Sequence, residues 1–137
     1  MQLTPVIAVH MTSALAALAV GPVVIWARRG HTIRPTWHRS LGYAWVALML
    51  TAALSALFIR DFALPNVLGY TPIHLLVVLT LSSLTGAFHA LAKGNVTLHR
   101  KLMQNLYYSA CVGAGAFTLL PSRYLGQLVW GQWLGLL

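Results

Sequence analysis

The chain has 137 residues, of which 58% are hydrophobic and only 7% are charged, and its mean hydropathy is +0.74. Such a chain has too few polar side chains to cover a soluble domain, so we expect an integral membrane protein. The formal charge of +8 comes from nine Lys and Arg residues against one acidic residue, Asp61. The basic residues fall in short gaps between apolar runs. They therefore indicate membrane topology and contacts with anionic lipid, and no nucleic-acid partner is expected.

Four apolar runs approach the roughly 20 residues that a helix needs to cross about 30 Å of hydrocarbon. In chain order they are Pro5–Ala27, Leu41–Ile59, Pro72–Ala92 and Leu102–Pro121. The first run is followed by Arg28 and Arg29 and not by a small-residue cleavage site, so we expect it to be retained. The fold class predicted is an all-α integral membrane protein, built as a four-transmembrane-helix bundle.

The last segment, residues 122–137, is short for a span and places tryptophans and leucines among Gly, Gln and Ser. We expect it to lie along the outer membrane interface as an amphipathic helix. The predicted organisation is therefore a transmembrane domain over residues 1–121 and an interfacial tail over residues 122–137. Within the spans, small residues such as Gly86 and Gly113 predict positions where helix backbones approach closely.

Basic residues are distributed unevenly between the two sets of loops. The gaps after the first and third spans receive seven: Arg28, Arg29, Arg34, Arg39, Lys93, Arg100 and Lys101. The other side receives only Arg60 and Arg123. Because positive residues concentrate on the cytoplasmic side of membrane proteins, both hairpin gaps are predicted to be cytoplasmic and both termini external.

The chain reads as two similar helical hairpins, residues 1–60 and 65–121. Thr-Pro opens spans one and three, while His38-Arg39 and His99-Arg100 open spans two and four. The halves run in the same direction, so their pseudo-symmetry axis should lie along the membrane normal. The repeat places His38 and His99 at the cytoplasmic mouths of their helices, and His10 and His74 near the outer ends.

Ionisable side chains inside a membrane are costly, so each histidine is a candidate functional residue. Histidine is a common axial ligand of haem iron, and facing helices of a bundle can hold a haem between them. His10 with His74 would form an outer pair of haem iron ligands. Two of His38, His89 and His99 would form an inner pair. The cofactor predicted on this basis is haem b.

Structural roles for the same residues remain open. His10 could instead hydrogen-bond a neighbouring helix, for which Thr12, Ser13 and Thr71 are available; as an iron ligand, it would have its Nδ1–H held by a nearby hydroxyl or carbonyl. At the cytoplasmic mouths, Arg39 and Arg100 fit lipid head-group contacts, and the His-Arg pairs could also bind quinone or an anion.

Aromatic residues gather toward the ends of the spans and are interpreted as an interfacial belt, not as the lining of a cofactor site. They are Trp26, Trp37, Tyr43, Trp45, Tyr70, Tyr107, Tyr108 and Tyr124. The single cysteine, Cys111, allows no intrachain disulfide and is interpreted as a small buried hydrophobic residue.

Three short motifs resemble those of a bacterial family of small, four-helix predicted membrane proteins of unknown function. They are the early membrane histidine His10, the His-Arg-x-Leu-Gly pattern at 38–42 and the His-Arg-x-x-Met-x-x-x-Tyr pattern at 99–107. The resemblance covers most of residues 5–121 and implies a location in the bacterial cytoplasmic membrane, but no activity. More loosely, the depths of the histidines are similar to those of four-helix haem b membrane cytochromes.

Two functions of different classes are compatible with these features. One is a membrane electron carrier that binds haem b through paired histidines and exchanges electrons with quinone or a membrane redox protein. The other is a non-catalytic accessory or scaffold subunit of a larger complex. With Asp61 as the only acidic residue, there is no carboxylate pair for glycosidase or aspartic-protease chemistry. The lack of an intramembrane carboxylate also argues against a proton-coupled transporter.

Overall fold

The computed structural model describes residues 4–28, 33–60, 67–71 and 74–136, and these residues are overwhelmingly helical. Three long helices, α1 (Pro5–Trp26), α2 (Pro35–Ala56) and α3 (Leu75–Ala92), precede a composite fourth helix. The fourth runs without a break from α4 (Val96–Leu106) through the π-helical segment η2 (Tyr107–Gly113) to α5 (Ala114–Thr118). The all-α prediction is therefore confirmed.

Helix starts follow from local chemistry. Thr4 precedes α1, and its side chain accepts a hydrogen bond from the Ile7 amide (3.3 Å), while Pro5 opens the helix. Asn95 caps α4 in the same way, accepting from the Leu98 amide (3.0 Å). These side chains satisfy amides that have no partner within the first turn, and proline at the first position has no amide to satisfy.

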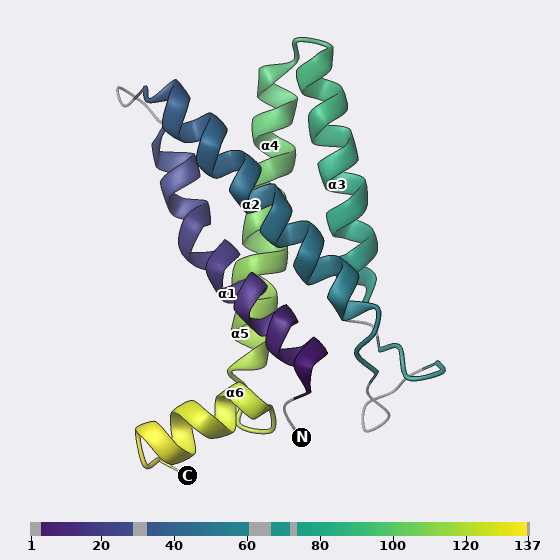
Figure 1. Ribbon diagram of the computed structural model, residues 1–137, viewed down its shortest axis with the longest axis vertical. Helices are drawn as coiled ribbons and strands as arrows, with labels where there is room; N and C mark the ends of the chain where they lie inside the picture. The colour runs from purple at the N-terminus through teal and green to yellow at the C-terminus, as the bar shows by residue number, and fades with distance from the viewer. Residues whose placement is uncertain (1–3, 29–32, 61–66, 72–73, 137) are drawn as a thin grey trace.

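The helices form two hairpins that lean against each other at an angle (Figure 1). α1 packs on α2 and η2, and α3 packs on α2 and α4. The end of α1, the start of α2 and the turn that joins α3 to α4 lie at one end of the bundle, and the start of α1 and the C-terminal helix lie at the other. We call the first the basic end, because its described residues include Arg28, Arg34, Arg39, Lys93, Arg100 and Lys101.

Two of the helices in the described part of the chain, α1 and α3, are long and apolar enough to cross a membrane. The other two predicted spans differ from them in composition. α2 begins with a polar turn that includes His38 and Arg39, and α4 carries Arg100 and Lys101 in its first half. The structure thus supports two apolar spans directly.

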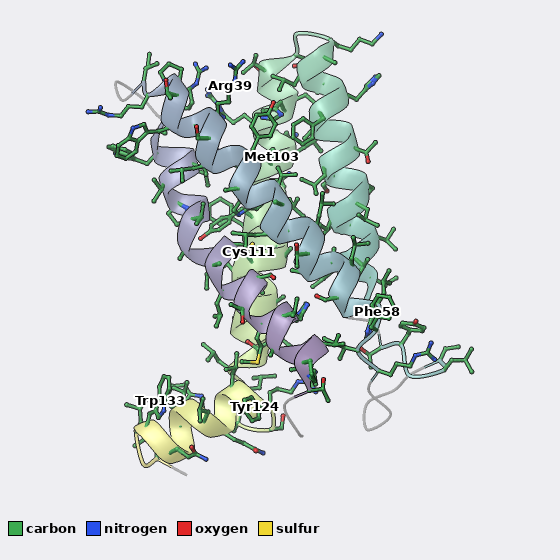
Figure 2. The ribbon with its side chains drawn as sticks, in the orientation of Figure 1. Arg39, Phe58, Met103, Cys111, Tyr124 and Trp133 are labelled. Atoms are coloured by element: carbon green, nitrogen blue, oxygen red, sulfur yellow. The ribbon has the colours of Figure 1, made fainter. Side chains whose placement is uncertain are left out.

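The centre of the bundle is filled by side chains from all four helices. The buried cluster consists of Ala17, Trp45, Met49, Leu84, Leu106, Tyr107 and Cys111. The interpretation of Cys111 as a buried hydrophobic residue is confirmed, and its Sγ lies 3.5 Å from Met49 Sδ (Figure 2). The interpretation of the aromatics as an interfacial belt is wrong for Trp45 and Tyr107, which are 4% and 7% exposed and belong to the core.

Pro22 leaves one backbone carbonyl of α1 without its usual amide partner, and a side chain of the core supplies the missing hydrogen bond. The carbonyl of Leu18 would normally accept from the amide four residues later, but Pro22 has no N–H to donate. Tyr107, the first residue of η2, instead donates its hydroxyl to the Leu18 carbonyl (3.0 Å). At the preceding residue, Trp45 donates its Nε1–H to the Ala17 carbonyl (3.1 Å). α1 is thereby tied to both α2 and η2.

Small residues leave room for a neighbouring helix at some positions in the bundle but not at others. Ser13, Ala17 and Gly21 form the buried stripe of α1, and a Cβ at Gly21 would collide with the Tyr107 ring. A Cβ at Gly86 would lie 3.3 Å from Leu102 Cδ1, in agreement with its predicted contact role. Gly113 is exposed, and a Cβ there would meet only the Tyr108 carbonyl of its own helix, so the contact predicted there is wrong.

The tail forms a helix that runs from α6 (Tyr124–Gly126) into the π-helical segment η3 (Gln127–Trp133) and lies across the end of the bundle (Figure 1). Gly126 is so close to the Leu119 and Leu120 carbonyls that a Cβ would overlap them. Trp130 donates its Nε1–H to the Leu119 carbonyl (2.7 Å). The tail is therefore docked on the bundle, while Trp133, at its far end, is 72% exposed (Figure 2).

The Tyr107→Phe variant should lose about 1 kcal/mol of stability, because the Leu18 carbonyl then lacks both the hydroxyl and an amide at position 22. In a Pro22→Ala background the same change should cost less, because the new amide can bond that carbonyl. Denaturant unfolding of the four proteins of this double-mutant cycle measures the difference. The neighbouring Tyr108→Phe, at an exposed ring, is the control. Equal losses in both backgrounds would contradict the explanation.

Gly21→Ala should destabilise the bundle by about 1–3 kcal/mol, because the added methyl group collides with the Tyr107 ring. Gly115→Ala is the matched control: it also lies within a helix, but its Cβ would meet nothing within 4 Å. There the substitution should be neutral or stabilising, because alanine has the better helix propensity. Thermal denaturation followed by circular dichroism compares the two, and similar melting of both variants would argue against the contact.

Candidate functional site

Three histidines share one hydrogen-bonding arrangement. Nδ1 of His10 lies 2.8 Å from the Ala52 carbonyl oxygen, and Nδ1 of His38 and of His99 lie 3.0 Å from the carbonyls of Val24 and Ala87. A carbonyl oxygen can only accept, so Nδ1 carries the proton in each ring. Nε2 is then left with a lone pair in the neutral imidazole. This is the tautomer in which histidine binds a metal through Nε2.

His38 and His99 occupy equivalent positions in the two hairpins. Each is the fourth residue of its helix, and their backbone amides donate to the carbonyls of Arg34 and Asn95, the residues just before α2 and α4. Each ring then donates to the preceding helix of its own hairpin, at Val24 and Ala87. The internal repeat seen in the sequence is therefore reproduced in the local hydrogen bonding of these two residues.

Both rings are half-buried at the basic end of the bundle, and their Nε2 atoms have no hydrogen-bond partner among the described residues. These nitrogens are also not sealed from the surface, since the described residues contain no buried, unpaired side-chain nitrogen or oxygen. Phe88 packs edge-on against His99, with 6.2 Å between ring centroids. Arg39 and Arg100, the next residues in sequence, are both exposed, and Figure 2 shows Arg39 at the basic end.

His10 is bonded to α2 and not to its own helix. Besides the Ala52 carbonyl, its Nδ1 lies 3.3 Å from the Ser55 hydroxyl. The hydroxyls of Thr12 and Ser13, considered above as holders of this ring, instead donate to carbonyls four residues earlier in α1. The alternative that His10 bonds a neighbouring helix is confirmed.

Both ring nitrogens of His74 are hydrogen-bonded. It is the N-cap residue of α3 and so lies at the helix end, not inside the helix. Its Nδ1 accepts from the Thr71 amide (3.0 Å), and its Nε2 lies 2.8 Å from the Ile59 carbonyl, to which it donates. An iron atom could bind this ring only after one of those bonds had broken. The structure therefore does not bring His10 and His74 together as a free ligand pair.

The remaining candidate residues give less support for a ligand-binding site. His89 is exposed on α3 and makes no side-chain hydrogen bond with the described residues. His31 and Asp61 lie outside the described residues. In the part of the chain that the structure describes, no three His, Cys, Asp or Glu residues are grouped so that they could hold a metal ion. His10, His38 and His99 are the histidines that combine a bonded Nδ1 with an Nε2 that has no partner among the described residues, and His38 and His99 both lie at the basic end.

Sequence reasoning found these histidines but missed what holds them. The acceptors at Val24, Ala52 and Ala87 are backbone carbonyls, which no sequence motif marks. The contribution of Tyr107 was also missed, although Pro22 signals an unpaired carbonyl four residues earlier, at Leu18. That signal shows where a donor is needed, but it does not identify the donor.

Comparison with known proteins identifies one family. Residues 7–130 match the model of DUF2306, described as a predicted membrane protein. No curated protein and no solved structure shows significant similarity to the chain. The match covers all four long helices and most of the tail, and it agrees with the apolar composition and with the two span-length helices, α1 and α3. The chain therefore belongs to the DUF2306 family of predicted membrane proteins.

Proposed function

We propose that this protein is a small membrane electron carrier that binds haem b at the basic end of its bundle through His38 and His99. The observation that carries the proposal is the matched pair of Nδ1–H bonds to the Val24 and Ala87 carbonyls. The haem is a proposal of ours and does not follow from the family match.

The donor set fits haem iron. An imidazole whose Nδ1–H donates to a carbonyl is fixed in orientation and is a more basic ligand through Nε2. Held by His38 and His99, haem b would supply one-electron redox chemistry. Arg39 and Arg100 lie beside the two ligands in sequence and are exposed, so their guanidinium groups are placed to pair with anionic propionates. In the absence of haem they would face lipid head groups.

This proposal uses the inner histidines and not the outer ones. The pair His10 and His74 would require His74 to give up Thr71 or Ile59 as a partner. His89 is exposed on α3, and no hydrogen bond to a described residue fixes the orientation of its ring. Its role is then contact with the membrane interface. The electron partners we propose are quinone or a membrane redox protein.

The membrane arrangement that we propose has four spans in the bacterial cytoplasmic membrane. The fourth helix is continuous over residues 96–118, long enough to cross about 30 Å, although its first half is polar. The end of α1, the start of α2 and the turn that joins α3 to α4 lie at the basic end, and the start of α1 and the C-terminal helix lie at the other (Figure 1). The positive-inside rule then places the basic end in the cytoplasm, the termini outside and the tail along the outer interface.

A second candidate function is a non-catalytic accessory subunit. It is favoured by the core, whose centre is filled by Trp45, Met49, Leu106 and Tyr107, and by the docked tail, whose far end exposes Trp133. On this view the histidines only tie helices together. The two functions predict different absorbance: the electron carrier should show haem bands, and the accessory subunit should be colourless.

The purified protein, after addition of haemin, should show a Soret band and, on reduction, an α band. His38→Ala and His99→Ala should each abolish the bis-imidazole spectrum, because a single remaining ligand changes the spin state. His89→Ala is the matched control, an exposed histidine of α3, and should keep the spectrum. Absorbance and electron paramagnetic resonance measure the outcome, and circular dichroism checks folding. A colourless native protein, or unaltered spectra in the His38 and His99 variants, would leave the accessory function.

Single cysteines in a Cys111→Ala background should test the orientation with a membrane-impermeant maleimide on intact cells. Cysteine at Ile33 or Lys93, near the basic end, should be protected, and cysteine at Leu68 or Gln132 should be labelled. All four positions are exposed on the bundle, so protection would reflect the membrane and not burial. Labelling at Ile33 and Lys93 with protection of the other two would invert the topology.

A further inference from the structure

His74 differs from the other hydrogen-bonded histidines in the protonation state that its contacts require. The Thr71 backbone N–H can only donate, so Nδ1 of His74 must present a lone pair (3.0 Å). The Ile59 carbonyl can only accept, so Nε2 must carry the proton (2.8 Å). The contacts of this ring are therefore satisfied only by the neutral, Nε2-protonated imidazole.

Protonation has opposite consequences at the two kinds of site. A second proton on His10, His38 or His99 would go to Nε2, which has no partner among the described residues, and would leave the Nδ1–H bond intact. A second proton on His74 would go to Nδ1 and would face the Thr71 N–H. The contact with the Thr71 N–H would change from a hydrogen bond to a repulsion between two donors, while the Thr71 hydroxyl oxygen, 3.2 Å from Nδ1, could accept from the new N–H.

The ring of His74 holds together two segments that flank the connection from α2 to α3. Ile59 lies just after the end of α2 at Ala56, and Thr71 is a buried residue shortly before α3. The Thr71 hydroxyl also lies 3.2 Å from Nδ1, and the Tyr70 ring packs edge-on against the imidazole, with centroids 5.1 Å apart. The imidazole is thus the shared contact of both segments.

A cation, Arg60, lies beside the Tyr70 ring in the same connection. Arg60 stacks on the Tyr70 ring (4.7 Å) and donates to the Leu68 carbonyl (2.8 Å) and the Tyr70 hydroxyl (3.2 Å). The nearest histidine on α1, His10, bonds α2 one to two turns before Ile59. α5 itself has no titratable side chain, and Arg123 stacks on its Phe117 (4.9 Å). Asp61, the neighbour of Arg60, lies outside the described residues.

We propose that His74 is a proton-operated latch on the connection between α2 and α3. At neutral pH the ring joins the Ile59 carbonyl to the Thr71 amide and holds the connection closed. Acidification protonates Nδ1 and removes the acceptor for the Thr71 amide, which loosens the connection at Thr71, while the Tyr70 hydroxyl stays bonded to the Leu57 carbonyl (3.0 Å) and Arg60 to the Leu68 carbonyl (2.8 Å). Because the closed form needs the neutral ring, lowering the pH favours the open form. The latch does not depend on haem.

The geometry is tested first on the native protein. Nitrogen-15 NMR of histidine-labelled, full-length protein in nanodiscs at neutral pH should show the Nε2-protonated tautomer for His74, assigned by its loss in His74→Gln. The resonances lost in His10→Gln, His38→Gln and His99→Gln should be those of Nδ1-protonated rings. A His74 ring protonated at Nδ1 would overturn the proposal whether or not any variant folds.

The latch itself is tested by hydrogen exchange over residues 67–71 at pH 7.5 and 5.0, corrected for the intrinsic pH dependence of exchange. Native protein should lose about tenfold in protection of the Thr71 amide at pH 5.0, the size of one lost hydrogen bond. His74→Gln, whose amide can accept from Thr71 and donate to Ile59 without titrating, should be insensitive to pH. His10→Gln should behave like the native protein, and Asp61→Asn should leave the pH response in place. Equal protection of native protein at both pH values, or a pH response retained in His74→Gln, would overturn the latch.

Discussion

The bundle is held together by side-chain donors that bond backbone carbonyls of neighbouring segments. Trp45 bonds Ala17 and Tyr107 bonds Leu18, and the histidines bond Val24, Ala52, Ile59 and Ala87. This pattern follows from composition, because a chain with nine basic residues and one acidic residue has almost no carboxylate acceptors. Indole, phenol and imidazole donors then have to find acceptors on the backbone. In an apolar environment an unpaired donor would cost several kcal/mol, so most of these bonds fix how the helices pair within each hairpin, and the bonds from Tyr107 to Leu18 and from His74 to Ile59 join the two hairpins.

The contact between Tyr107 and Leu18 is the point where several local features depend on one another. Pro22 frees the Leu18 carbonyl, Gly21 leaves room for the aromatic ring, and η2 begins at Tyr107 itself. A π-helical segment shifts the side chains that follow it relative to a regular α-helix. In this region the side chains of Tyr107 and Cys111 both reach the core, where Cys111 meets Met49. Proline, glycine and the widened helix are thus parts of one packing arrangement.

Composition and periodicity were sufficient to predict the all-α fold, the ends of α1 within a residue or two, and the equivalence of His38 and His99. They were not sufficient to predict partners. Trp45 and Tyr107 resemble interfacial aromatics in sequence, because they lie within polar halves of their helices, yet helix crossing turns both into the core. Gly113 resembles a contact glycine but faces outward, since the contacts of η2 with α1 are made by other residues. Such outcomes depend on the rotation of each helix about its axis, which weakly amphipathic membrane helices do not encode clearly.

The histidines show how the placement of one proton separates residues that the sequence treats alike. His10 and His74 were paired by depth, and His38 with His99 by motif, but hydrogen bonding divides the four differently. Three rings donate through Nδ1 and keep an accessible or ligand-competent Nε2, whereas His74 uses both nitrogens. The first arrangement tolerates a metal or a second proton at Nε2, because the bond that fixes the ring is made by the other nitrogen. At His74, a metal or a second proton would break one of the two hydrogen bonds of the ring. The two proposals therefore use different ends of the bundle, ligand binding at the basic end and proton sensitivity at the connection between α2 and α3, so a variant can remove one property without the other.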